Sequence, residues 1–132
     1  MKEGAHPDPK HISLADFEKI ELRVGQVKAV KKHPKNNDYV LLIDLGMAEQ
    51  DLQVVADISD AYSMDELIGK QVCVVVNTRE EEIQGFESQG LLLVTTREGK
   101  TVLLSPEHVV HPGVKIYGVM NGTRTHHSEI GK

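Results

Sequence analysis

The sequence contains few aromatic residues and almost no cysteine. Among its 132 residues there is no Trp, and there are three Tyr, two Phe and one Cys, so a core must be mainly Val, Leu and Ile. Cys73 has no partner for an internal disulfide, which suits a reducing compartment. No apolar run reaches the ~18 residues of a membrane-spanning helix, and the first eleven residues lack the apolar stretch of a signal peptide. We therefore expect a cytoplasmic protein with no membrane partner.

Motifs for catalysis and for metal binding are also missing. There is no nucleophile elbow, phosphate-binding glycine loop or HExxH sequence. His108 and His111 lie three residues apart, but the prolines on both sides of them argue against a helix that would bring them together. His126 and His127 are adjacent in a polar tail, and no cysteine or carboxylate stands at a spacing typical of zinc sites. We therefore expect no catalytic residue, metal or cofactor, and histidines exposed in loops.

The apolar residues follow strand patterns along most of the chain. The expected strands are 22–30, 39–45, 52–58, 71–76, 91–96, 101–104 and 114–119. Capping signals predict short helices after Ser13 and from Ser63 to Gly69. Gly25 suggests a bulge or a sharp bend in the first strand, and 77–90 is expected to be a loop. This order predicts an all-β protein, an OB-fold five-stranded barrel with one short helix between strands three and four.

The predicted domain has short extensions at both ends. Residues 1–11 are rich in Pro, Gly, His and Lys and are expected to form a mobile arm. The barrel domain is expected to cover residues 12–120, and residues 121–132 to form a polar tail. No internal repeat and no linker divides the chain into two cores.

Charge is segregated along the chain, although the formal net charge is only −5. Residues 23–38 contain five basic residues and one acid, whereas 79–87 contain one base and four acids. In an OB-fold, the turn after the first strand and the loop between strands four and five border the nucleic-acid-binding face. Lysines in that turn suit phosphate contacts, and equally suit a solvated hairpin end. The glutamates at 80–82 are either a solvated loop surface or part of a binding wall.

Several short motifs occur together in one order and with consistent spacing. They are Ile12–Gly25, His33-Pro34, Asp44-Leu-Gly46, Met64–Val72, Gly85–Gly90, Val102–Pro106 and Pro112-Gly113. In this arrangement the chain resembles the tRNA-binding domain family. That domain is appended to many methionyl-tRNA synthetases, occurs in synthetase-associated cytokine-like proteins, and stands alone as a small bacterial protein.

The resemblance implies an OB-fold that binds tRNA through shape and backbone without catalysis, and that forms a homodimer when it stands alone. Such a protein would assist tRNA aminoacylation, with tRNA and an aminoacyl-tRNA synthetase as its partners. The residues expected to contact tRNA are Lys31, Lys32, Lys35, Asn36, Asn77, Arg79, Ser88 and Gln89.

One departure from the family pattern leaves a second function open. The loop after Asn77 is usually basic in the family, but here it reads Arg79-Glu-Glu-Glu82. Three carboxylates near a phosphate-binding face weaken tRNA affinity. The CsaA-like secretion chaperones resemble the same fold and bind peptides as dimers, and an acidic rim would favour basic, unfolded segments. Docking on a synthetase through the acidic loop is a third possibility.

Overall fold

The structure, a computed structural model, describes residues 10–47, 49–120 and 123–124. Most of the predicted arm, 1–11, and tail, 121–132, lies outside these residues. The helices are α1 (Leu14–Glu18) and α2 (Met64–Leu67), and the strands are β1 (Leu22–Lys32), β2 (Tyr39–Asp44), β3 (Leu52–Ala56), β4 (Gln71–Val75), β5 (Glu81–Ile83), β6 (Phe86–Ser88), β7 (Leu91–Leu92), β8 (Val94–Arg97), β9 (Lys100–Leu103), β10 (Val119–Met120) and β11 (Thr123–Arg124).

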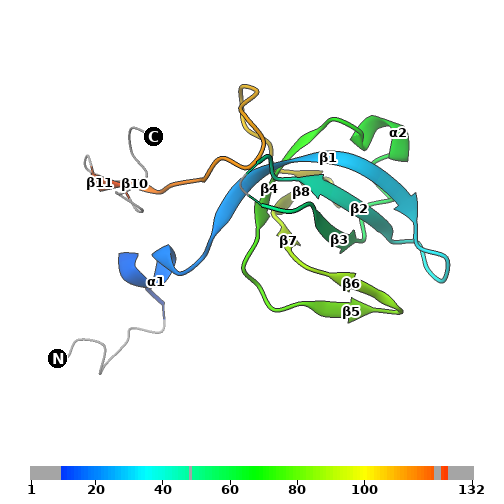
Figure 1. Cartoon of the computed structure of the whole chain (residues 1–132), viewed down its shortest axis with the longest axis horizontal. Coiled ribbons are helices and arrows are strands. Elements are labelled where there is room, and N and C mark those ends of the chain that lie inside the picture. The colour runs from blue at the N-terminus through cyan, green and yellow to red at the C-terminus, as the bar shows by residue number, and fades with distance from the viewer. Residues whose placement is uncertain (1–9, 48, 121–122, 125–132) are drawn as a thin grey trace.

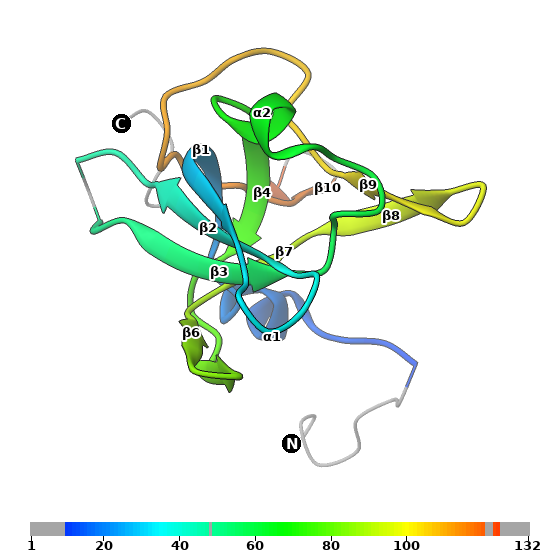
Figure 2. The same cartoon turned by 90° about the vertical axis from the view of Figure 1, so that its right-hand side faces the viewer.

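Five strands form one antiparallel sheet in the order β3-β2-β1-β4-β7, which curls into a nearly closed barrel (Figures 1 and 2). The two outer strands, β3 and β7, approach each other where the barrel closes. The segment after β6 joins them: the Gln89 N–H donates to the Gln53 carbonyl at 2.7 Å, and the Gln53 N–H donates to Gln89 Oε1 at 2.8 Å. Closure covers sheet edges that would otherwise be exposed. The predicted OB-like barrel is confirmed.

Branched aliphatic side chains fill the barrel, as the composition requires. Leu41 and Ile43 of β2 and Val72 and Val74 of β4 are fully buried, and Leu67 of α2 packs onto the same cluster. Alternate residues of each strand point inward, so the apolar positions two apart reach one core. β4 is buried at four of its five positions, which accounts for its continuous apolar run.

Both predicted helices begin at their predicted caps. Ser63 Oγ accepts a hydrogen bond from the Glu66 N–H at 3.3 Å, and Glu66 Oε2 accepts one from the Ser63 N–H at 2.7 Å. This reciprocal pair is a capping box. Ser13 Oγ caps α1 by accepting from the Asp16 N–H at 3.0 Å. The capping signals were therefore sufficient to locate both helix starts.

The segment expected to be a loop, residues 77–90, contains the β5–β6 hairpin. Gln84 and Gly85 both have positive φ angles, 49° and 98°, as a type I′ turn requires. Such turns are usually Asn-Gly or Asp-Gly, so Gln-Gly gave a weak signal for a hairpin.

Two further expectations were wrong. Gly25 pairs regularly with Val72, and the irregularity in β1 falls between Val27 and Ala29. Gly25 is instead a site of close packing, because a Cβ there would overlap the Ile43 side chain. Residues 114–119 make only one isolated bridge, between Lys115 and Arg23, before β10 begins. This segment nevertheless lies along β1, since the Val24 N–H donates to the Val114 carbonyl at 3.0 Å.

Candidate functional site

Three lysines lie close together at the end of β1 and in the turn to β2. Lys31, Lys32 and Lys35 are all exposed there. The His33 N–H donates to the Asp38 carbonyl at 2.9 Å and closes the turn. Lys28, further back on β1, differs because its Nζ lies 2.7 Å from Asp51 Oδ2. This hydrogen bond and the negative charge of Asp51 raise the pKa of Lys28.

This turn touches the tip of the β5–β6 hairpin, with which it forms what we call the turn–hairpin junction. His33 Nε2 lies 3.0 Å from the Ile83 carbonyl oxygen, and the His33 and Phe86 rings meet edge to face with centroids 4.9 Å apart. The Lys31 ammonium lies 4.8 Å from the Phe86 ring centroid, a cation–π contact. The expectation that the histidines are exposed is therefore wrong for His33, which is only 2% exposed.

Asn36 also belongs to the turn–hairpin junction. Its Nδ2 donates to Gln84 Oε1 at 2.7 Å, across the gap between turn and hairpin. Its Oδ1 accepts from the Asp38 N–H at 2.7 Å, which shapes the turn itself. The structure thus brings four predicted site residues, Lys31, Lys32, Lys35 and Asn36, to one end of the barrel, where the hairpin extends in the same direction (Figure 1).

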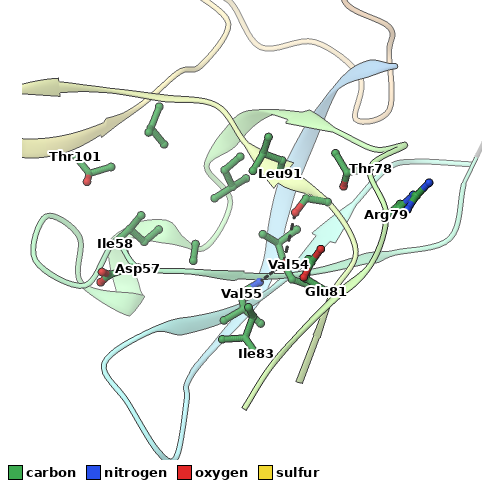
Figure 3. A pocket seen from close by; sticks show the side chains of 15 residues that line it. Val54, Val55, Asp57, Ile58, Thr78, Arg79, Glu81, Ile83, Leu91 and Thr101 are labelled. Carbon is green, nitrogen blue, oxygen red and sulfur yellow. Dashed lines mark hydrogen bonds between the residues drawn. The ribbon is translucent and has the colours of Figure 1, made fainter. Parts of the chain in front are cut away.

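A pocket of about 510 Å³ opens between β3, the hairpin and β7 (Figure 3). Two predicted site residues, Arg79 and Ser88, line it. Its other lining residues are mostly apolar: Val54, Val55, Ala56, Ile58, Ile83, Leu91, Leu92 and Val94. The charged lining residues are Arg79, Asp57 and Glu81, so acids outnumber bases. Such a pocket suits a neutral or cationic group with an apolar body better than an anion.

The hairpin register separates the three consecutive glutamates. Glu81 pairs with Ser88, and Glu82 pairs with Glu87. Because paired residues share a face and successive residues alternate, Glu81 lies on the pocket face and Glu82 on the opposite one. Glu80 lines a separate depression of about 290 Å³ that also includes Gln89. The acidic run therefore does not present one continuous surface.

The polar side chains of Ser88 and Gln89 take part in barrel closure. Ser88 Oγ accepts from the Val55 N–H at 3.0 Å, and this bond is drawn in Figure 3. Gln89 Oε1 accepts from the Gln53 N–H, as described above. These two side chains replace strand-to-strand pairing along the edge of β3. They hold the pocket wall in place.

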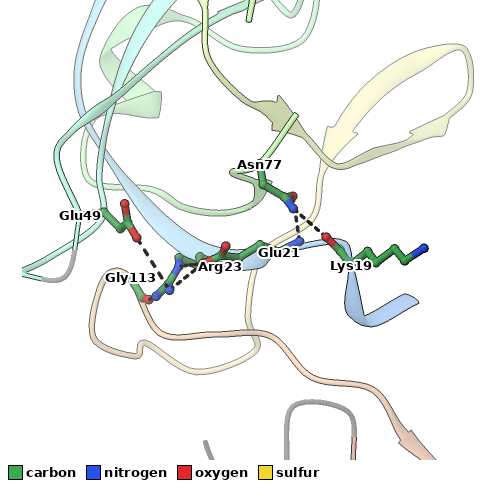
Figure 4. A network of polar contacts seen from close by, with 6 residues as sticks. All are labelled: Lys19, Glu21, Arg23, Glu49, Asn77 and Gly113. Atoms are coloured by element: carbon green, nitrogen blue, oxygen red, sulfur yellow. Dashed lines mark hydrogen bonds and ion pairs between the residues drawn. The ribbon is translucent and has the colours of Figure 1, made fainter. Parts of the chain in front are cut away.

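Asn77 faces the segment between α1 and β1 and is not one of the pocket-lining residues (Figure 4). Its Oδ1 accepts from the Glu21 N–H at 2.9 Å, and its Nδ2 donates to the Lys19 carbonyl at 2.6 Å. Nearby, the Arg23 guanidinium donates to Glu21 and to the Gly113 carbonyl. Asn77 therefore fixes the helix-bearing end of the chain to the barrel.

The sequence interpretation missed His33 and Phe86 as site residues. Both belong to motifs of the resemblance, His33-Pro34 and Gly85–Gly90, but a contact between residues 53 positions apart has no local signal. In the part of the chain that the structure describes, no three His, Cys, Asp or Glu side chains are grouped to hold a metal ion. No helix in the described ranges is long and apolar enough to cross a bilayer. Burial raises the pKa of the Cys73 thiol, which lies half-buried in β4.

These features define an OB-type binding module. They are the barrel, the basic turn after β1, and the pocket beside β7. The family model of the tRNA binding domain matches residues 22–115, and the chain belongs to this family. Among its relatives are the methionine–tRNA ligases of Archaeoglobus fulgidus, 37% identical over 86% of this chain, and of Methanocella arvoryzae, 38% identical over 87%. The matched part is only 17% of each ligase.

Solved structures of similar fold include small proteins matched over nearly their whole length. The chaperone CsaA of Bacillus anthracis is 33% identical, with a TM-score of 0.72 over 80% of this chain and 98% of that one. The MetRS related protein of Pyrococcus horikoshii is 30% identical, with a TM-score of 0.73 over 80% and 97%. The family and the fold are thus shown together.

Proposed function

We propose that this chain binds tRNA without catalysing a reaction, as an auxiliary of tRNA aminoacylation in the cytoplasm. The observation that carries the proposal is the group of exposed ammonium groups, Lys31, Lys32 and Lys35, at the barrel end that also bears the hairpin. Family membership and the ligase relatives support tRNA as the ligand. Lysines there contact phosphates, while the hairpin and pocket wall supply the shape that a folded RNA meets.

Alanine at Lys31, Lys32 and Lys35 together is expected to weaken tRNA binding and lower its salt dependence. Each lost phosphate contact reduces the slope of log affinity against log salt by about 0.7–0.9, so three reduce it by about 2–3. Titration of bulk tRNA at several salt concentrations measures both quantities. Lys100→Ala, in the exposed β8–β9 hairpin, is the control and leaves the slope unchanged. Absence of tRNA binding by the unaltered protein at low salt would refute the proposed function.

Peptide binding is a second candidate function, and the pocket is the observation that favours it. Leu91 and Val94 line the pocket and are 54% and 45% exposed, while Asp57 and Glu81 add acidic groups. An apolar segment flanked by basic residues would complement this surface. If peptide binding is the function, Leu91→Asp abolishes suppression of client aggregation, whereas the triple lysine variant leaves it intact. If tRNA binding is the function, the triple lysine variant weakens tRNA binding, and the unaltered protein does not suppress client aggregation.

We further propose that two copies associate through their terminal segments. Ile12, Leu14 and Val119 are 69%, 46% and 68% exposed, and α1 contributes no buried residue to the barrel. α1 and β10 both lie beyond the same end of the barrel (Figure 1). A dimer would remove these side chains from water. Sedimentation equilibrium should give twice the chain mass at micromolar concentration, and Leu14→Asp should shift it toward the mass of one chain.

A further inference from the structure

The protonation state of His33 follows from its two hydrogen-bond partners. The Lys35 backbone N–H lies 3.0 Å from His33 Nδ1 and can only donate, so Nδ1 accepts. The Ile83 carbonyl lies 3.0 Å from Nε2 and can only accept, so Nε2 carries the proton. Both contacts are satisfied only by the neutral Nε2–H tautomer. One nitrogen holds the turn, and the other holds the hairpin.

The hairpin depends on this outside support. Its strands are three residues each, and an isolated two-stranded hairpin is marginally stable. Glu82 and Glu87 stand directly opposite each other, which adds like-charge repulsion. Gln84 has a positive φ of 49°, unusual for a residue other than glycine. β3 holds the base of the hairpin, where the Val55 N–H donates to Ser88 Oγ at 3.0 Å and Gln53 Nε2 donates to the Glu87 carbonyl at 2.8 Å. The tip is held by the contacts of the turn–hairpin junction.

We propose that neutral His33 is a positioning residue for RNA, locking the turn to the hairpin so that Lys31 and Lys35 are held beside the pocket wall. Loss of the neutral form unlocks the junction. The inference rests on the proposed tRNA-binding function. It adds to that function a role for a buried side chain: His33 does not contact RNA but fixes the positions of the lysines that do.

Protonation of His33 opposes the junction through its charged neighbours as well as its hydrogen bonds. A proton on Nδ1 would face the Lys35 N–H, so that two donors would meet. Lys31 of β1 already places its ammonium over the Phe86 ring, and Lys35 follows in the turn. Among the acids, Asp38 closes the turn through its carbonyl, and Glu82 and Glu87 lie on the far face of the hairpin. A doubly protonated ring therefore does not fit the junction.

His33→Asn and Phe86→Leu test the proposal. Asparagine keeps an acceptor for the Lys35 N–H but removes the Nε2 donor and the ring, so the turn remains while the link to the hairpin is lost. Leucine at position 86 keeps the apolar bulk and removes the ring contacts. At pH 7.5 each variant should bind tRNA about fivefold more weakly than the unaltered protein.

Amide hydrogen exchange provides a readout that needs no RNA. Both variants should exchange faster at 34–38 and at 82–87 together, while the β8–β9 tip, which has the same type of turn, stays unchanged. Unchanged tRNA affinity of both variants, or unchanged exchange in both segments, overturns the inference while leaving tRNA binding in place. Absence of tRNA binding by the unaltered protein overturns the proposed function and the RNA-positioning role with it, even where exchange confirms the junction.

Discussion

Replacing Glu80, Glu81 and Glu82 by lysine is expected to strengthen tRNA binding on the order of 100-fold near 0.15 M salt. The estimate is the value reached when all three lysines contact phosphates, each contributing about 0.7–0.9 to the slope of log affinity against log salt, which requires RNA on both faces of the hairpin. The gain should shrink as salt rises, and the slope should steepen by about 2–3. Filter binding or fluorescence anisotropy with bulk tRNA over a salt series measures both.

Single Glu→Lys variants show which face of the hairpin the RNA contacts. Glu81 lies on the pocket face of the hairpin and Glu82 on the opposite face, although the two are adjacent in sequence and equally charged. If RNA lies across the pocket and the basic turn, Glu81→Lys strengthens binding more than Glu82→Lys. Equal gains would indicate attraction by net charge alone. A triple variant with unchanged affinity would contradict RNA contact with the hairpin altogether.

The fold was predictable because local signals and the global topology agree. Ser63, Glu66 and Gly69 mark the start and end of α2, and apolar alternation locates the barrel strands. The β5–β6 hairpin was missed because its Gln-Gly turn lacks the usual Asn-Gly signal and its strands carry more charge than apolar surface. Its stability comes from contacts with β3 and the first turn, which no local pattern encodes.

For the candidate site, the sequence predicts which residue types lie at the strand ends, but not how they are arranged in space. The lysines of the turn stand at the expected strand end, because β1 continues to Lys32. The pocket is lined by residues of β3 and of β7, which are far apart in sequence. Its apolar walls therefore depend on how the barrel closes. Asn77 and Ser88 each have side-chain hydrogen bonds to backbone groups, which sequence does not reveal. The orientation of each glutamate required the hairpin register.

Gly113 is one of the points at which the C-terminal segment is attached to β1, together with Val114 and Ile116. Gly113 donates its N–H to the Val24 carbonyl at 2.6 Å and accepts from Arg23 Nη1 at 2.6 Å. Arg23 is only 12% exposed and also pairs with Glu21, so this contact links both ends of the domain (Figure 4). Gly113 has a φ of +94°, and a Cβ there would overlap the Leu45 carbonyl. A residue with a side chain at this position would be strained by the backbone angle and would also clash with the Leu45 carbonyl.

Gly113→Ala should therefore lower the free energy of unfolding by about 3 kcal/mol, through backbone strain together with the clash. Gly69→Ala is the matched control, since Gly69 has a φ of +85° but nothing within 4 Å of an added Cβ. Gly69→Ala introduces backbone strain without a clash and should lower the free energy of unfolding by about 1 kcal/mol. Urea denaturation followed by circular dichroism gives both values. Equal losses would mean that close packing against Leu45 contributes nothing, and that the C-terminal segment is held by Arg23 and β1 alone.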